Sequence, residues 1–252
     1  MNSSTAPAEP ETEITRQSPS PGSAAWWRER RAARDRRRHR PGGLTTEQIT
    51  ETALAIVDGE GLAALTMRRL ADQLGTGAAS LYRHVANREE LLVEVVDHVL
   101  GSVEFGTPKP TWREDFRNQA HLLRAALIDH PHLLPVALRT PLLGPNAVRG
   151  REACLRRMLD YGFSPADVQP MYTVIVTTVL GQAVFAAQRA TGERDRPEPL
   201  RPEVYRDLPA DRYPTVTALA DRTEPQTSSA LFTLTIDIML DGIEARYPRA
   251  LE

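Results

Sequence analysis

The sequence predicts an all-α protein in which an N-terminal three-helix helix-turn-helix domain precedes a larger helical domain. Apolar residues recur at helical spacing through most of residues 44–247. No segment shows the strict alternation of a half-buried strand. A glycine turn at residues 75–77 joins two short amphipathic segments, which is the arrangement of a helix-turn-helix.

The composition excludes several classes of protein. The 252 residues are 41% hydrophobic, which is enough to bury a sizeable core, and 31 basic residues nearly balance 33 acidic ones. The single cysteine, Cys154, rules out a disulfide scaffold or a cysteine-based zinc finger. No run approaches about 18 uncharged apolar residues and no signal peptide is evident. We therefore exclude a membrane-spanning or secreted protein and expect a cytoplasmic one.

The N-terminal extension, residues 1–43, is expected to be disordered and rich in arginine. Residues 21–43 carry a net charge of +6, whereas residues 44–100 carry −5. Residues 24–40 could form a helix, but Trp26-Trp27 is their only large apolar pair and a Pro-Gly-Gly sequence follows them. Two interpretations stay open: a solvated tail, or an arm that binds nucleic acid.

Two helices are predicted at the start of residues 44–100. Thr45 and Gln48 form a capping box, and apolar residues at helical spacing continue this first helix until Gly59. Thr66 then caps a second, short helix with apolar residues on one face.

Two further helices follow the glycine turn at residues 75–77. A short third helix is expected over residues 78–84, and Asn87 with Glu90 caps a fourth that reaches about Leu100. The second and third helices, joined by this turn, complete the helix-turn-helix pattern.

Helical spacing continues beyond Gly106. The expected helices cover residues 112–129, 131–138, 147–161, 164–189 and 228–247, with a proline-rich loop over 192–214. Ser164-Pro165-x-Asp167 favours a helix start, because it combines a cap, a first-turn proline and an acid near the positive helix end. The last two helices are apolar on more than one side, so we expect each to pack against several partners.

The most specific motif is LTMRRLADQLGTGAASLYRHVANREELL, residues 65–92. It contains Leu-Thr-x-Arg-x-Leu-Ala-x-x-Leu-Gly, then Leu-Tyr-x-His-Val and x-Asn-Arg-x-x-Leu-Leu, and it resembles the DNA-binding domain of the TetR family of transcriptional regulators. The similarity covers residues 44–100. The helix from Trp112, the Gly-Phe-Ser turn at 162–164 and the ending MLDGIE at 239–244 resemble, more loosely, the effector domain of tetracycline repressors.

The resemblance implies a one-component regulator: a homodimeric repressor that a small-molecule effector releases from a palindromic DNA operator. Residues 44–100 would then bind DNA, and residues 101–252 would bind the ligand and dimerise. The helices over 164–189 and 228–247 would pair with their twins in a four-helix bundle. The alternatives are an activator, or a helical ligand-binding protein without sequence-specific DNA binding.

Nine residues are predicted to contact DNA: Arg68, Gly77, Ala78, Ala79, Ser80, Tyr82, Arg83, His84 and Arg88. Small residues at the start of a recognition helix let its backbone approach base edges, and Tyr82 and His84 match the family's positions for contacts to the DNA backbone. Arg83 stands where tetracycline repressors have a bulky aromatic, so we expect a guanine or phosphate contact from it. Each residue also has a structural alternative: a packed tyrosine, a histidine at a helix end, or arginines as solvated surface charges.

Seven residues are predicted to line the effector pocket: His121, Arg124, Arg157, Met158, Tyr172, Gln182 and Phe185. They add polar or adaptable groups to helices that the resemblance places around the cavity. The histidine that chelates magnesium in tetracycline repressors falls at Ala137 here, which argues against a metal–tetracycline effector.

No catalytic residue, metal ligand or cofactor is predicted. His121 and His130 are nine residues apart and would point in opposite directions on a helix, while a proline separates His132 from both. No glycine-rich phosphate loop or Gly-x-Ser-x-Gly elbow occurs. Cys154 has apolar neighbours at helical spacing and is expected to be a core thiol.

Overall fold

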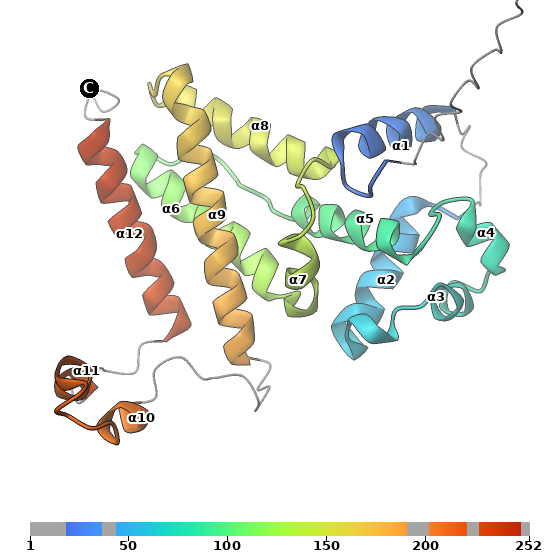
Figure 1. The fold of residues 1–252 in the computed structure, drawn as a ribbon. Coiled ribbons are helices and arrows are strands. Elements are labelled where there is room, and N and C mark those ends of the chain that lie inside the picture. The colour runs from blue at the N-terminus through green and yellow to red at the C-terminus, as the bar shows by residue number, and fades with distance from the viewer. Residues whose placement is uncertain (1–18, 37–43, 191–201, 221–226, 248–252) are drawn as a thin grey trace, which may run out of the picture.

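The computed structural model describes residues 19–36, 44–190, 202–220 and 227–247, and in these ranges it contains twelve α-helices and no strand (Figure 1). The helices are α1 Ala24–Arg36, α2 Thr46–Glu60, α3 Met67–Gln73, α4 Ala78–Tyr82, α5 Arg88–Gly101, α6 Trp112–Ile128, α7 Leu134–Ala137, α8 Pro145–Asp160, α9 Pro165–Ala190, α10 Pro202–Arg206, α11 Pro214–Ala220 and α12 Ser228–Arg246. Two 3₁₀ turns, η1 Leu62–Ala64 and η2 Pro131–Leu133, complete the set. The predicted all-α fold class is confirmed.

The helix starts of the N-terminal domain follow the sequence signals. The Thr45 hydroxyl accepts from the Gln48 amide at 3.1 Å, and the Gln48 side chain accepts from the Thr45 amide at 2.9 Å. Thr66 caps α3 in the same way, and the Asn87 side chain accepts from the Glu90 amide at 2.9 Å. These side chains satisfy amides that the first turn of a helix leaves without a partner.

The core of the N-terminal domain extends past residue 100. Buried residues of α2, α3, α4 and α5 form one cluster with Leu133, Val136 and Ala137 from η2 and α7. A second contact, between Nδ1 of His130 and Oδ2 of Asp58 at 2.8 Å, joins the end of α6 to α2. Apolar burial therefore joins the helix-turn-helix to the first part of the larger domain.

A second core holds α6, α8, α9 and α12 together. Trp112 and Phe163 meet edge to face with ring centroids 5.4 Å apart, and Phe116 packs against both. Val179 in the middle of α9 is 0% exposed, so it belongs to this core within a single chain.

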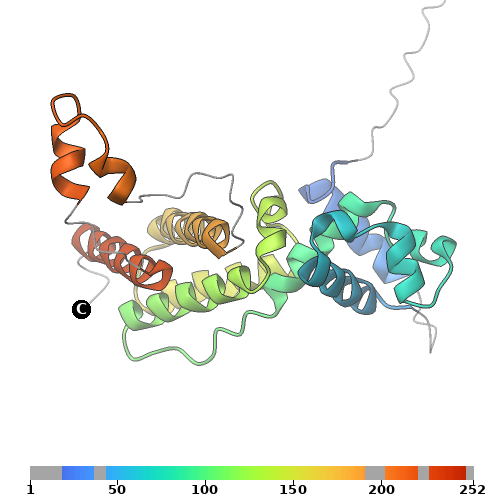
Figure 2. The same cartoon turned by 90° about the horizontal axis from the view of Figure 1, so that it is seen from below.

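The expected loop over residues 192–214 is only partly correct. Residues 191–201 lie outside the described part of the chain, but 202–220 contain the two short helices α10 and α11, which pack on each other. In both views this hairpin stands away from α6, α8 and α9 (Figures 1 and 2). Prolines at the first position of each helix explain the error, because they start helices as readily as they mark loops.

Within the extension expected to be disordered, residues 24–36 form a helix, in the stretch 24–40 that the sequence allowed to be helical. They form α1, whose two tryptophans are each 5% exposed and pack with Val93 of α5. This pair of large apolar residues buries one side of the helix against α5. Residues 19–23 form a turn before α1, and residues 1–18 and 37–43 lie outside the described residues.

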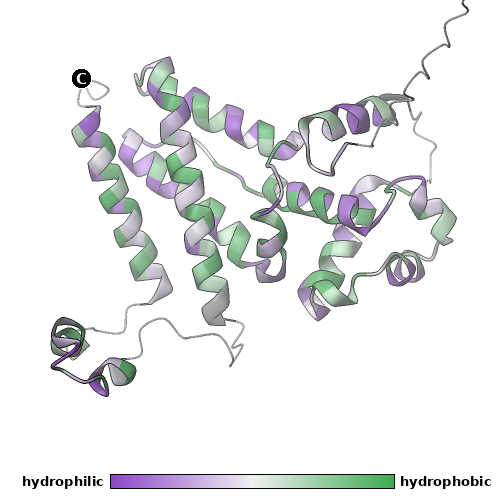
Figure 3. Cartoon of the chain, viewed as in Figure 1, coloured by the Kyte–Doolittle hydropathy of each residue, from purple (hydrophilic) through white to green (hydrophobic). Residues whose placement is uncertain are grey.

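One helix, α9, meets the length and composition criteria for crossing a membrane, criteria that a core helix of a globular protein also meets. Residues 165–187 of α9 are long and apolar enough to cross a membrane, with a mean hydropathy of 1.5. Colouring by hydropathy shows apolar residues on several sides of α9 and α12 (Figure 3). One side of α9 packs against α6, α8 and α12, and another leaves Val174 and Phe185 exposed.

Candidate DNA-binding and effector sites

The helix-turn-helix presents α4 and its flanks to solvent. Gly75 takes a φ of +62° in the turn between α3 and α4, a conformation that side chains disfavour. Leu81 and Val85 are fully buried and anchor α4 from below, whereas Tyr82 is 51% exposed. The α4 face therefore projects from a fixed platform, as a helix that enters a DNA groove must.

Most of the predicted DNA-contact residues lie together on this face. Gly77, Ala78 and Ala79 are exposed at the start of α4. Ser80 accepts a hydrogen bond from the Arg83 guanidinium at 2.9 Å, so these two side chains are held side by side. Arg68 is exposed on α3, and His84 is half-buried just beyond α4.

Arg88 is half-buried and bonds to backbone carbonyls of the same domain. Its guanidinium donates to the carbonyls of Leu65 at 2.7 Å and Leu62 at 2.5 Å. These bonds tie the start of α5 to η1 and its flank through two of the five N–H donors of the guanidinium. Arg88 therefore also has a structural role, because it holds α5 against the segment that precedes α3.

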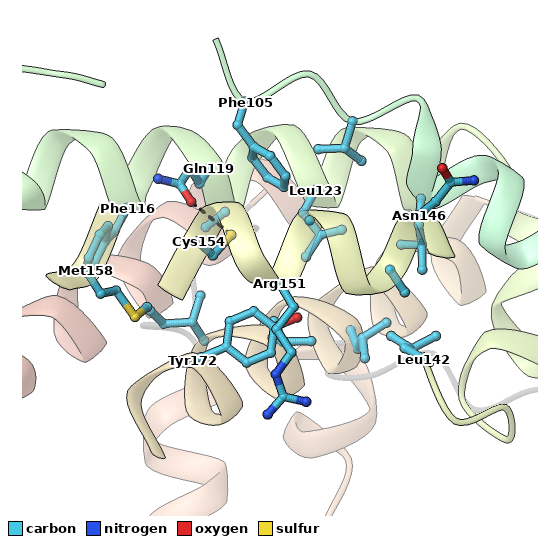
Figure 4. Close-up of a pocket in the computed structure, with 18 residues that line it drawn as sticks. Phe105, Phe116, Gln119, Leu123, Leu142, Asn146, Arg151, Cys154, Met158 and Tyr172 are labelled. Carbon is cyan, nitrogen blue, oxygen red and sulfur yellow. Dashed lines mark hydrogen bonds between the residues drawn. The ribbon is translucent and has the colours of Figure 1, made fainter. Parts of the chain in front are cut away.

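A cavity of about 70 Å³, partly open to solvent, lies between α6, α8 and α9 (Figure 4). Its lining is mainly apolar and aromatic, and none of the lining residues is a carboxylate. Polar groups come from Gln119, Asn146, Arg151, Cys154 and Tyr172. Such a composition suits an apolar ligand with few polar groups.

Four of the polar lining residues contact each other in two pairs. The Cys154 thiol donates to Oε1 of Gln119 at 3.1 Å, and the Arg151 guanidinium lies 5.0 Å from the Tyr172 ring centroid. Burial raises the pKa of Cys154 to about 12 and that of Tyr172 to about 12. Both groups are therefore neutral at physiological pH, and Arg151 is the cation of the lining.

The structure brings two of the seven predicted pocket residues, Met158 and Tyr172, to the cavity. His121 and Arg124 lie on the face of α6 that meets α12, where both pack against the ring of Phe232. Burial, followed by the charge of Arg124, lowers the pKa of His121. These two residues join helices and line no part of the cavity.

The other three predicted pocket residues also lie elsewhere. Arg157 donates to Asp115 at 3.1 Å and holds the chain before α6 through the carbonyl of Phe105. Gln182 donates to Thr235 of α12 at 3.3 Å, and Phe185 is exposed on α9. Cys154, expected in the core, lies in the cavity wall instead.

Sequence analysis missed most of the lining, although helical spacing could have found it. Each helix contributes a stripe with intervals of three or four residues: Phe116, Gln119, Ala120 and Leu123 on α6; Ala147, Gly150, Arg151, Cys154 and Met158 on α8; Tyr172, Ile175, Val176 and Leu180 on α9. The α8 and α9 stripes pass through Met158 and Tyr172, so extension from these two residues would have identified them.

Comparisons with known proteins agree with this architecture. The family profile described as "Bacterial regulatory proteins, tetR family" matches residues 49–95, and "Tetracyclin repressor-like, C-terminal domain" matches residues 106–247. The repressor DrrR1 of Streptomyces coeruleorubidus is 32% identical over 214 residues, which is 80% of this chain and 77% of that protein. A transcriptional regulator of Saccharopolyspora erythraea is 34% identical over 156 residues, covering 60% of this chain and 66% of its own length.

Solved structures give the same result. ActR of Streptomyces coelicolor, in complex with actinorhodin, superposes with a TM-score of 0.72 at 35% identity, covering 81% of this chain and 98% of ActR. The complex of ActR with (S)-DNPA has a TM-score of 0.71 at the same identity.

Proposed function

The chain belongs to the TetR family of transcriptional regulators, and from this we propose that it is a cytoplasmic, homodimeric repressor that a small apolar molecule releases from a pseudo-palindromic operator. Its family has no enzymatic activity, and its relatives are transcriptional repressors. One observation supports the proposal above all: α5 runs from the helix-turn-helix directly to Leu100 in the wall of the effector cavity. We assign DNA binding to residues 44–100, and ligand binding and dimerisation to residues 101–252.

The DNA contacts proposed for this surface are those of α4 and its flanks. Exposed Tyr82 would fix the recognition helix on the phosphate backbone, Arg83 would reach a guanine edge or a phosphate, and Arg68 would bind phosphate from α3. Ala78 and Ala79 leave room for the helix to approach thymine methyl groups.

Tyr82→Ala and Arg68→Ala test this assignment. An operator selected from random DNA and mapped by footprinting should bind each variant more weakly, because contacts that position the protein are lost. Arg156→Ala, on the far end of α8, is the matched control and should bind like the parent. Parental affinity in both test variants would remove these two residues from the DNA interface.

The dimer rests on the exposed apolar face shared by α9 and α12. Val174, Phe185, Leu234 and Ile238 are all large, apolar and exposed in the single chain. A second copy, related by a two-fold axis, would cover this face as a four-helix bundle. Two recognition helices about 34–36 Å apart would then enter successive major grooves.

The effector is proposed to be an aromatic, largely apolar small molecule bound between α6, α8 and α9. Phe105, Phe116 and Tyr172 offer ring faces, Arg151 offers a cation, and the lining contains no carboxylate. The ActR complexes with actinorhodin and (S)-DNPA show that a similar protein binds small molecules. Mass spectrometry of protein purified from its natural host tests the proposal, since a co-purified aromatic molecule should be lost in a Phe116→Ala variant. Retention of the molecule by that variant would place it outside this cavity.

A further inference from the structure

Helix α1 docks on the helix that connects the two domains. Trp26 and Trp27 stack edge to face with ring centroids 4.6 Å apart and form a buried cluster with Val93 of α5 and Leu143. The guanidinium of Arg30 lies 5.3 Å from the Trp26 ring centroid. Apolar burial of two indole rings is a substantial contribution to docking.

The connecting helix α5 carries a buried carboxylate, Glu94, whose ion pairs within the described part of the chain all come from α1. The Glu94 side chain on α5 is 2% exposed, and each of its oxygens accepts from one arginine of α1. Arg30 donates to Oε1, and Arg34 donates to Oε2 at 2.8 Å. Because a buried carboxylate without a cationic partner is costly, this face of α5 requires α1.

The same region of α5 holds the start of α8. One turn after Glu94, the Asp97 carboxylate accepts from the amides of Asn146 and Ala147 at 3.2 and 3.0 Å. A Cβ atom added to Gly144 would lie 2.8 Å from the Trp27 ring and closer still to Asp97. Trp27 therefore touches the point where α5 and α8 meet.

The surface of α5 on which α1 rests, formed around Val93 and Glu94, is called the α1 seat below. It adjoins the wall of the effector cavity. Leu100, Leu142 and Ala147 line the cavity, and the same three residues line a small void beneath Trp27. A movement of α5 relative to α8 would change both the cavity and the surface on which α1 sits. Helix α1 lies along α5 beside the start of α8 (Figure 1).

We propose that α1 is an intramolecular brace: it locks α5 against the start of α8 and so fixes the orientation of the helix-turn-helix relative to the effector cavity. Conformers in which α5 swings away from α8 lose the Trp27 contact or leave Glu94 without its arginines. Docked α1 therefore narrows the range of domain orientations. The brace also resists any cavity ligand whose binding needs this movement.

A matched pair of double variants tests the brace. The seat variant Arg30→Gln/Arg34→Gln removes the two partners of Glu94. The surface variant Arg28→Gln/Arg31→Gln removes two exposed charges from the other side of the same helix. Both lose the same charge, so electrostatic effects on DNA binding are matched. Trp27→Ala provides an independent seat variant.

The first readout is the orientation of the two domains. Spin labels at Glu51→Cys on α2 and Asp160→Cys on α8, in a Cys154→Ser background, report it through double electron–electron resonance. Labelled protein is diluted in unlabelled protein so that distances arise within one chain. We expect both seat variants to broaden the distance distribution and the surface variant to match the parent. Parental distributions in both seat variants, with tryptophan emission showing that α1 has left its seat, would overturn the proposal.

The second readout rests on the proposed function. In the seat variants, the fraction of molecules whose domains are oriented for DNA binding should fall. If that fraction is about a tenth, the apparent Kd for a selected operator rises about tenfold relative to the surface variant. If the distance distribution broadens in the seat variants but the parent protein binds no DNA, the repressor function is overturned and the brace is supported. Operator binding by the parent without broadening in either seat variant would overturn the brace alone.

Discussion

Ile238→Asp should convert the proposed dimer into monomers. Ile238 is 62% exposed on α12, so an aspartate there is well solvated in the single chain and leaves its fold intact. In the two-fold bundle each substitution appears twice, which puts two unpaired carboxylates in an apolar interface.

The magnitude follows from burial. At about 3 kcal/mol for each carboxylate, the two copies cost about 6 kcal/mol, to which the lost apolar contact of the isoleucines adds. Since about 1.4 kcal/mol is a factor of ten, the dimer Kd should rise at least ~10⁴-fold. A dimer stable at nanomolar concentration would then be monomeric at low micromolar concentration.

Sedimentation velocity at low micromolar concentration measures this change. The control is Val148→Asp, which also replaces an exposed apolar residue by aspartate, but on α8. This variant should remain dimeric. Val179→Asp is unsuitable, because Val179 is buried within one chain and its replacement would unfold the protein. An intact Ile238→Asp dimer would show that this face of α12 does not form the interface.

Three further predictions concern the arm, the thiol and the junction of α5 with α8. Neutralising the three arginines of residues 37–40 should flatten the slope of log K against log salt by about 5 for a dimer, if each arginine reaches a phosphate; equal slopes would make this segment a solubilising tail. With its pKa raised from 9.0 to about 12, Cys154 should react with iodoacetamide at pH 8 about 10³-fold more slowly than a free thiol, and unfolding in urea should abolish the difference. Gly144→Ala should lower the free energy of unfolding by about 1–3 kcal/mol because its methyl group would overlap Asp97 and Trp27. Gly59→Ala, where nothing lies within 4 Å, should be neutral or stabilising by about 1 kcal/mol, and equal melts for both variants would contradict this geometry.

Local signals predicted the parts of the fold that local chemistry determines. The capping residues Thr45, Thr66 and Asn87 start α2, α3 and α5 where expected, because a cap acts within one turn of its own chain. The α4 surface was likewise predictable, since Tyr82 and its neighbours follow each other in sequence.

Long-range packing decided what the sequence left open. Periodicity shows that an α9 residue is apolar but not which neighbour covers it. The helix over 164–189 is expected to pair with its twin, yet its central residue Val179 is buried within one chain. For the same reason His121 and Arg124 were expected in the cavity and pack on α12. The docking of α1 depends on Glu94, some sixty residues away, and no local pattern reveals that pair.

The shared core of the helix-turn-helix and α7 limits how this regulator could be recombined with others. Leu133, Val136 and Ala137 are buried among the residues of α2 to α5, although they follow α6 in the chain. A chimera that takes only residues 44–100 from this protein would lack these three residues. The apolar residues of α2 to α5 that pack against them would then be exposed. To keep its core, a DNA-binding domain transferred from this protein to another must therefore include η2 and α7. The segment to be transferred is then discontinuous in sequence.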